Sequence, residues 1–428
     1  MRKKVKMQYS AYSYRPKPPE LPEPPPEERP NEPKSPWRRR VLIGLLIILI
    51  GVGGAGAYAL FARNENPPTA SNRATPTVTT PQLKTVKGRY LFSGTIVLDR
   101  LVASEAGSDY SQPFSGMDTF GKFDTGLADL ECPVTDSSYH GVKGQENPRF
   151  NCSPAWLPEL KKYFGIIKLA GNHTYDMGAD GFTQTIDRLQ QAGIQTVGHH
   201  NPHVEKDNCK VVALPVRIQK SDGLEEKGTL PIAFCAFNYK IIFAPEAGEI
   251  ETIQRYAKIM PVFGLLQAGA EYLTTAGISQ QTYARKMIDN GAAFVIANGT
   301  HYVQNSEVYK DKLIVYSLGN FIFDQTTYET MRALSIAVNL TANYDENISK
   351  WLALSNKCNA TARQDNCLEE AERQALSKIN LQLEFEPIGS SGGVRQITKK
   401  ADATLQKAIE TRLNWAQTTN QLGSKYQI

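Results

Sequence analysis

The stretch LAGNHTYDMG, residues 169–178, decides the fold of this chain. It follows an apolar run (residues 166–170) and precedes a segment with helical apolar spacing (residues 182–192), so the sequence predicts a strand, a polar tip and a helix. Side chains at the carboxyl ends of strands in an open α/β sheet lie where ligands bind. Asn172 and His173 could therefore share a divalent metal or hold a phosphate oxygen. The alternative is that Asn172 caps a turn and His173 is an ordinary core histidine.

The rest of the chain repeats this alternation of strands and helices. Further strands are predicted at residues 89–92, 125–130, 194–197, 211–216, 230–238, 260–266, 293–297, 313–318, 334–341 and 381–385, and helices at residues 154–164, 249–258, 279–290 and 401–417. Polar tips follow several strands, including Glu131, residues 267–272 and residues 298–301. The pattern favours an α/β core with layered sheets.

The charge distribution argues against a nucleic-acid partner. The net charge is only +5, and much of the excess lies in the first 40 residues, including Arg38, Arg39 and Arg40. A nucleic-acid surface requires a basic face on the folded part, and the remaining sequence contains no such cluster.

Residues 41–62 contain no charged side chain and are long enough to cross the hydrocarbon core of a bilayer. Basic residues precede this span, which predicts a cytoplasmic N-terminus and an extracytoplasmic remainder. A cleaved signal peptide is the alternative, because Ala57-Tyr58-Ala59 is a small-residue pattern. The long, proline-rich region before the span favours an uncleaved single-pass anchor in the cell membrane instead.

The sequence therefore divides into five predicted parts. Residues 1–40 form a disordered, proline-rich cytoplasmic tail, residues 41–62 a transmembrane helix and residues 63–87 an extended linker. Residues 88–345 form the α/β domain, and residues 346–428 a C-terminal extension packed on it.

All six cysteines follow the predicted span, in an oxidising compartment where disulfides form. Cys358 and Cys367 are close enough in sequence to be a local pair. Pairing Cys132 with Cys152 and Cys209 with Cys235 would complete a nearest-neighbour scheme. A structural zinc site is the alternative, and no C-x-x-C spacing supports it.

Several longer motifs resemble one family, the bacterial CapA-type capsule-synthesis proteins associated with poly-γ-glutamate. They are LADLECPVT (127–135), LAGNHTYDMGADGF (169–182), TIDRLQQAGIQTVG (185–198) and YSLGNFIFDQ (316–325), with support from residues 268–272 and 291–309. The extracytoplasmic domain of this family is similar to calcineurin-like metallophosphoesterases. The resemblance implies a four-layer α/β/β/α sandwich.

The resemblance also implies a site with two divalent cations, which would polarise a phosphoryl or acyl oxygen and activate water. It assigns metal binding to Glu131, Asn172, His173 and His301, with Asn172 and His173 also taking part in catalysis. It assigns the shaping of a substrate cleft to Glu271, Tyr272 and Asn320, although packing alone would also explain the Tyr.

The sequence departs from the family pattern at three expected ligands. Thr95 replaces an aspartate, while Gln267 and Asn298 replace histidines. Neutral oxygens are poor substitutes for carboxylate or imidazole ligands of a transition metal. We therefore expect a divalent metal (Mn, Fe or Zn) to be absent or weakly bound, unless Asp99 moves in as a substitute ligand.

A separate cluster of His199, His200 and His203 could also bind a metal, or could simply lie on an exposed loop. Two main functions remain open. The first is an active metal-dependent hydrolase or transferase on an envelope polymer or phosphoester. The second is a degenerate CapA-like domain that binds or scaffolds an envelope polymer or its assembly proteins. A tethered binding protein unrelated to polymers is a third.

Overall fold

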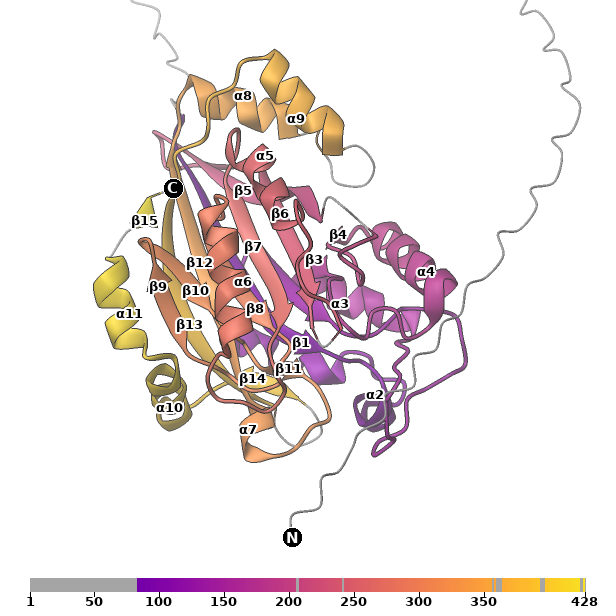
Figure 1. Ribbon diagram of the computed structural model, residues 1–428. Helices are drawn as coiled ribbons and strands as arrows, with labels where there is room; N and C mark the ends of the chain where they lie inside the picture. Colours follow the sequence, from indigo (N-terminus) through magenta and orange to yellow (C-terminus); the bar gives the residue numbers. More distant parts are fainter. Residues whose placement is uncertain are drawn as a thin grey trace, which may run out of the picture. The chain divides into compact units, whose positions relative to one another are not determined.

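Strand β1 (Leu83–Ile96) is the centre of a branched, mixed β-sheet of fifteen strands. Figure 1 shows β1 among the other strands of the sheet. The computed structural model describes residues 83–204, 208–240, 242–355, 358, 364–392, 397–423 and 426–427. The predicted tail, membrane span and first part of the linker lie outside these residues. Within the described residues, no helix has the length and apolar character needed to span a bilayer.

One arm of the sheet lies on both sides of β1, where β2 (Thr125–Leu130) pairs with residues 90–96 and β12 (Arg332–Asn343) with residues 85–93. On one side, β2 is followed by the parallel strands β3 (Phe164–Lys168) and β4 (Gln195–Val197). On the other side β12 and β13 (Gln382–Gly392) run antiparallel. The arm is completed by β11 (Asn320–Ile322), β14 (Thr398–Lys400) and β15 (Tyr426–Gln427).

The second arm starts from residues 83–87 of β1, which the sequence assigns to the linker. These residues pair with β5 (Cys209–Lys220), and Val86 is fully buried there, which explains why the strand begins before the predicted boundary. The arm continues through β6 (Glu225–Tyr239), β7 (Val262–Ala268), β8 (Phe294–Asn298), β10 (Lys312–Val315) and β9 (Ser306–Tyr309). Strands β6, β7, β8 and β10 are mutually parallel, so their carboxyl ends meet at one edge.

Helices flank both arms (Figure 1). The helices α3 (Leu157–Tyr163) and α4 (Gly178–Gln191) lie against β3 and β4, and α6 (Ile278–Asp289) lies against β7 and β8. The remaining helices are α2 (Arg100–Ala106), α5 (Ile253–Ala257), α7 (Tyr328–Met331), α8 (Glu346–Ser355), α9 (Gln364–Arg373), α10 (Ala403–Leu413) and α11 (Trp415–Leu422), with 3₁₀ turns η1 (Gln112–Phe114), η2 (Met117–Phe120), η3 (Pro154–Trp156) and η4 (Ile250–Thr252). The predicted mixed α/β class is confirmed.

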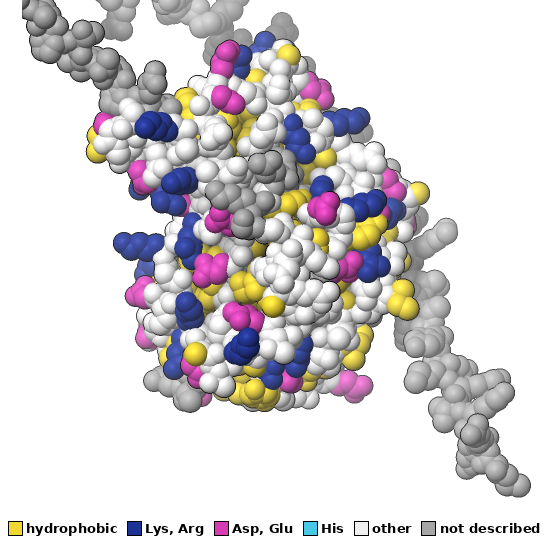
Figure 2. All heavy atoms as spheres, turned by 90° about the vertical axis from the view of Figure 1, so that its left-hand side faces the viewer, with side chains coloured by type: hydrophobic (Ala, Val, Ile, Leu, Met, Phe, Trp, Pro, Cys, Tyr) yellow, Lys and Arg dark blue, Asp and Glu magenta, His cyan; other side chains and the backbone are white. Residues whose placement is uncertain are grey.

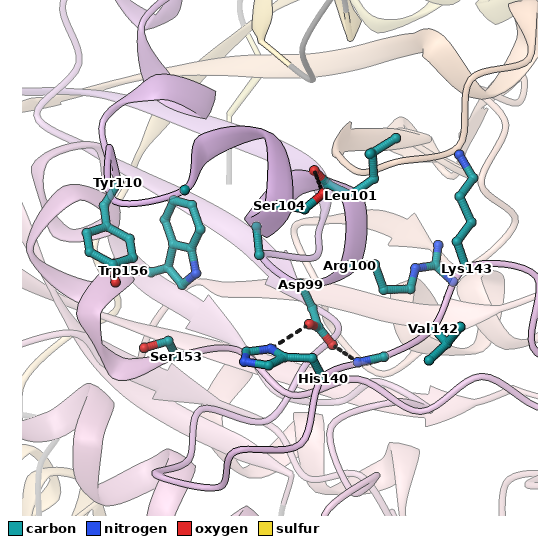
Figure 3. A pocket seen from close by; sticks show the side chains of 13 residues that line it. Asp99, Arg100, Leu101, Ser104, Tyr110, His140, Val142, Lys143, Ser153 and Trp156 are labelled. Atoms are coloured by element: carbon teal, nitrogen blue, oxygen red, sulfur yellow. Dashed lines mark hydrogen bonds and ion pairs between the residues drawn. The ribbon is translucent and has the colours of Figure 1, made fainter.

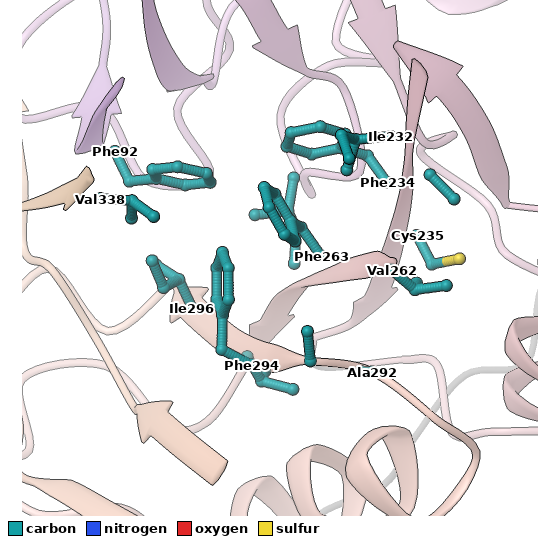
Figure 4. Packing of buried hydrophobic residues seen from close by; sticks show 14 of the residues in the cluster. Phe92, Ile232, Phe234, Cys235, Val262, Phe263, Ala292, Phe294, Ile296 and Val338 are labelled. Carbon is teal, nitrogen blue, oxygen red and sulfur yellow. The ribbon is translucent and has the colours of Figure 1, made fainter. Parts of the chain in front are cut away.

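Aromatic side chains from the two arms pack against each other (Figure 4). The Phe92 ring of β1 lies 6.2 Å from Phe234 of β6 and 5.6 Å from Phe294 of β8, measured between ring centroids. Phe263 of β7 lies 4.5 Å from Phe294. Since each buried ring removes a large apolar area from water, this cluster fixes one arm over the other and thereby the relative positions of their strand ends.

The prediction of disulfides is confirmed, and of the pairings that the sequence left open the structure has the nearest-neighbour scheme: Cys132–Cys152, Cys209–Cys235 and Cys358–Cys367. The second joins residues paired directly across β5 and β6. On the face drawn in Figure 2, acidic and basic side chains are interspersed, without a continuous field of one sign on that face.

Candidate functional site

Two rows of polar residues meet where the arms face each other. In the first arm, Thr95, Asp129 and Lys168 are register neighbours across β1, β2 and β3. In the second arm, a matching row runs across β6, β7 and β8 and consists of Asn238, Gln267 and Asn298. Both rows lie at the carboxyl ends of parallel strands, where an α/β sheet places its ligand sites.

Gln267 joins the two rows. Its Oε1 accepts a hydrogen bond from Lys168 Nζ at 2.7 Å. Its Nε2 donates to Glu131 Oε1 at 2.5 Å and to Asn172 Oδ1 at 3.1 Å. Thr95 Oγ1 also donates to Glu131 Oε1, at 3.3 Å. The single buried amide of Gln267, at the end of β7, therefore connects a lysine, a carboxylate and a second amide from the ends of β2 and β3.

The two carboxyl groups of this cluster are buried but have different surroundings. Lys168 Nζ lies 3.0 Å from Asp129 Oδ1, outside hydrogen-bond geometry, and neither Asp129 oxygen accepts a hydrogen bond from a described residue. Burial raises the pKa of Asp129 against the opposing charge of Lys168. Burial also acts to raise the pKa of Glu131, but the charges of His301 and His173 and the Gln267 hydrogen bond outweigh it, so that pKa is lowered. Glu131 is the better anion of the two.

His173 forms a pair with Asp176, whose Oδ2 lies 2.9 Å from His173 Nδ1. Asp176 is held in turn by the backbone N–H of Phe150 at 2.8 Å. Burial acts to lower the pKa of His173, but Asp176 and the charges of Glu131 and Glu271 outweigh it and raise that pKa. Since Asp176 engages Nδ1, the other ring nitrogen remains for a ligand, and a histidine so held can exchange a proton with one.

His301 lines the same cavity as His173, but it comes from the second arm. Its Nδ1 lies 2.9 Å from Asn320 Oδ1, and its Nε2 lies 3.8 Å from Glu271 Oε1. Both His301 and Tyr272 have left-handed backbones, with φ of 60° and 59°. Such conformations are disfavoured for residues with a side chain and are concentrated at functional sites.

These histidines open into a cavity of about 790 Å³. Of the residues that the resemblance assigns to the site, Asn172, His173, Glu271, Tyr272 and His301 line it. Glu131, Thr95 and Gln267 lie beneath, almost fully buried. The strand ends therefore lie close together, but only Asn172, His173 and His301 of the expected metal-site positions line the cavity, while Thr95, Glu131 and Gln267 are buried beneath it.

Two of the predicted site residues are occupied elsewhere. Asn298 Oδ1 accepts the backbone N–H of Leu318 at 3.2 Å, so this oxygen is tied to the main chain. Asn320 lies behind His301 and donates from Nδ2 to Gln325 Oε1 at 3.0 Å, and it does not line the cavity. Its position suits it to orient His301.

Asp99 does not substitute for the missing ligand. Its carboxylate accepts from the backbone N–H groups of Gly141 and Asn151 at 2.8 and 2.9 Å and lies 3.1 Å from His140 Nδ1. Figure 3 shows this pair in a second cavity, of about 660 Å³, with Trp156 and Tyr110 further along its wall. Asp99 fixes the loop that carries His140, and the hypothesis of a displaced metal ligand is wrong for this conformation.

The histidine cluster divides into two groups. His199 and His200 pack ring against ring at 4.2 Å, and burial lowers the pKa of His200 to about 4. His203 turns away and pairs with Glu249, with 2.5 Å between Nδ1 and Oε1. Ligand atoms of His203, Glu246 and Glu249 lie within 4.8 Å of one another, which is a grouping able to hold a metal ion.

Four basic residues at the site were missed by the sequence analysis: Lys168, Lys240, Arg100 and Arg149. Lys240 is buried and pairs with Glu271 at 3.3 Å, and Arg100 pairs with Asp324. For Lys168 a signal existed, because a lysine between Ile167 and Leu169 interrupts an otherwise apolar buried strand, and buried lysines require a partner.

Comparisons with known proteins identify the class of protein to which this site belongs. Residues 89–220 and 247–325 match the family described as "Bacterial capsule synthesis protein PGA_cap". The chain therefore contains a CapA-type capsule-synthesis domain, and the resemblance predicted from the motifs is confirmed.

The sequence identity to individual relatives is low. The chain is 27% identical to "Capsule biosynthesis protein CapA" of Bacillus anthracis over 42% of its own length and 45% of that protein. It is 25% identical to "PGA biosynthesis protein CapA" of Bacillus subtilis (strain 168), over 62% of this chain and 71% of that protein. The chain thus matches less than half of the first relative. The structure of TT1561 from Thermus thermophilus is similar with a TM-score of 0.31 and 10% identity, over 58% of this chain and 93% of that one, which is too low to support the assignment.

Proposed function

We propose that this chain is a membrane-anchored, extracytoplasmic CapA-like protein that acts in the biosynthesis of a capsule or other envelope polymer of the poly-γ-glutamate kind. We further propose that its central site is a degenerate metal centre, and that the two arms of the sheet correspond to the inner layers of a four-layer α/β/β/α sandwich. The family match supports the polymer context, and the predicted anchor at residues 41–62 supports the location.

The position of the Gln267 amide is the main support for the proposal of a degenerate metal centre. Glu131 Oε1 and Asn172 Oδ1, two oxygens that would bind a metal, both accept hydrogen bonds from Gln267 Nε2. An amide NH₂ group and a lysine ammonium only donate hydrogen bonds, so neither can be a metal ligand. The donors present do not fit a two-metal centre, and we derive no reaction step through a metal.

The cavity chemistry supports an anionic ligand. Basic side chains from both arms line it, and those of Arg100 and Lys240 are paired with Asp324 and Glu271. Arg149 is different, because its guanidinium donates to the backbone carbonyl of Asp176, and no described carboxylate forms an ion pair with it. Its positive charge is therefore available at the cavity mouth to a carboxylate-bearing polymer.

Polymer production in a strain that lacks the chain tests this proposal. We expect the wild-type chain and His173→Ala to restore polymer, and a chain without residues 41–62 to fail. Arg149→Glu should reduce polymer severalfold, since it reverses the unpaired charge. Arg373→Glu, which changes an exposed arginine on α9, is the matched control and should behave as wild type.

The alternative is an active metal-dependent phosphoesterase or transferase on an envelope polymer. The observation that favours it is the His173–Asp176 pair facing the cavity beside Asn172 and His301. Under this alternative, His173→Ala abolishes polymer production although the protein accumulates normally. That result would reject the degenerate centre.

A further inference from the structure

Lys168 has an unusual environment for a lysine. Its side chain is 2% exposed, on a strand whose Phe164, Ile166 and Ile167 enter the apolar core. Burying a lysine is costly unless its charge is compensated and its N–H groups find acceptors. Here the compensation comes from Asp129, 3.0 Å away across the β2–β3 pair, and the acceptor is Gln267 of the other arm.

We propose that Lys168 is the resident cation of this centre, replacing the charge that a divalent metal would supply and positioning the Gln267 amide that holds the remaining ligand oxygens. This inference rests on the degenerate centre proposed above. It names Lys168 as the residue whose charge takes the place of the metal. Lys168 is a positioning residue, since it lies under the cavity and does not line it.

The hydrogen-bond directions follow from Lys168. A lysine ammonium can only donate, so the Gln267 atom that contacts it must be the amide oxygen. The amide nitrogen then necessarily points away, toward Glu131 and Asn172, which both offer oxygens. Lys168 therefore sets the donor–acceptor direction of each hydrogen bond that Gln267 makes in this network. The Gln267 amide nitrogen lies between Glu131 and Asn172, two of the expected metal ligands.

The charges lead to the same conclusion. Asp129 and Glu131 are both almost fully buried, in one site with a single lysine at its centre. The resemblance expects a further carboxylate at position 95, and Thr95 is neutral there. Lys168 places a positive charge beside Asp129 and near Glu131, so this cluster needs less external positive charge than two buried carboxyl groups without a cation would.

Removing the Lys168 charge should therefore leave the buried carboxyl groups in need of another cation. In Lys168→Met the apolar stem is kept, but Asp129 and Glu131 lose their compensating charge. We expect the melting temperature of the full chain, purified in mild detergent without chelators, to fall by on the order of 5 °C. Millimolar Mn²⁺ or Zn²⁺ should recover part of this loss.

Lys240→Met is the matched control. Lys240 is equally buried and also paired with a carboxylate, but it lies outside the Asp129–Glu131 cluster. With His203→Ala added to all three proteins, which removes a ligand of the His203–Glu246–Glu249 group, neither Lys240→Met nor the otherwise wild-type chain should gain stability from the metals. An unchanged melting temperature for Lys168→Met, or the same response to metal in all three proteins, would overturn the proposal.

A second variant covers the case in which Lys168→Met does not fold. Lys168→Ser combined with Gln267→His opens the same space and restores an imidazole, so we expect close to one Mn²⁺ or Zn²⁺ per chain by elemental analysis. A double variant that folds but binds no metal would overturn only the inference about Lys168. Stoichiometric metal in the wild-type chain, with phosphodiester turnover, instead overturns the degenerate centre itself.

Discussion

Replacing Gln267 by leucine is expected to lower the free energy of unfolding by about 3–5 kcal/mol, because it leaves buried charges without their partners. The amide satisfies Lys168 on one side and Glu131 and Asn172 on the other, and Gln267 itself is fully buried. Leucine has a similar volume, so the loss reflects the polar contacts and not a cavity. Equilibrium denaturant unfolding of the full chain measures the effect.

Gln280→Leu provides the matched comparison. Gln280 is 1% exposed and donates to two neutral acceptors, Gln304 Oε1 at 2.9 Å and the Tyr316 carbonyl at 2.6 Å. Because no charged group depends on it, its replacement should cost only about 1–3 kcal/mol. Equal losses for the two variants would mean that the charged network contributes nothing beyond ordinary buried hydrogen bonds.

The second large effect is expected from Cys132→Ser combined with Cys152→Ser. This disulfide closes a loop with a sequence separation of 20, and its removal should cost about 3 kcal/mol through the entropy of the unfolded chain. The loop contains Phe150, two residues before Cys152. The backbone N–H of Phe150 donates to Asp176, and its ring lies 4.7 Å from His173. We therefore expect faster amide hydrogen exchange in residues 133–151 and 169–178, besides the lower stability.

The Cys358–Cys367 disulfide is the control for this experiment. Its sequence separation of 9 is shorter, and neither cysteine lines the cavity. Its double serine variant should lose slightly less stability, with amide exchange around His173 unchanged. If both pairs of substitutions loosened the segment around His173 equally, or neither did, the proposed link between the first disulfide and the site would be incorrect.

Local patterns predicted the strands and the pairing of the cysteines well. The predicted strand at residues 125–130 coincides with β2, because its apolar run ends at once in polar residues. The predicted helix at residues 401–417 is instead two helices, α10 and α11, since Asn414 adopts a left-handed backbone with φ of 57°. A single residue at positive φ leaves no trace in apolar spacing.

The site was predictable only in part, for a physical reason. Strand tips carrying Glu131, Asn172 and His301 could be recognised because each follows an apolar strand. The bond between Lys168 and Gln267 joins residues 99 positions apart on different arms. Register between the arms depends on the packing of Phe92 against Phe234 and Phe294, which no local pattern encodes.

The metal content of the full chain, purified without chelators and measured by elemental analysis, tests the central claim most directly. Because the Gln267 amide takes up the oxygens of Glu131 and Asn172, we predict far less than one Mn, Fe or Zn per chain at the strand ends. The His203–Glu246–Glu249 group is a separate candidate ligand set, so the measurement should be repeated on His203→Ala. One or two metal ions per chain that persist in His203→Ala but are lost in His173→Ala would contradict the account.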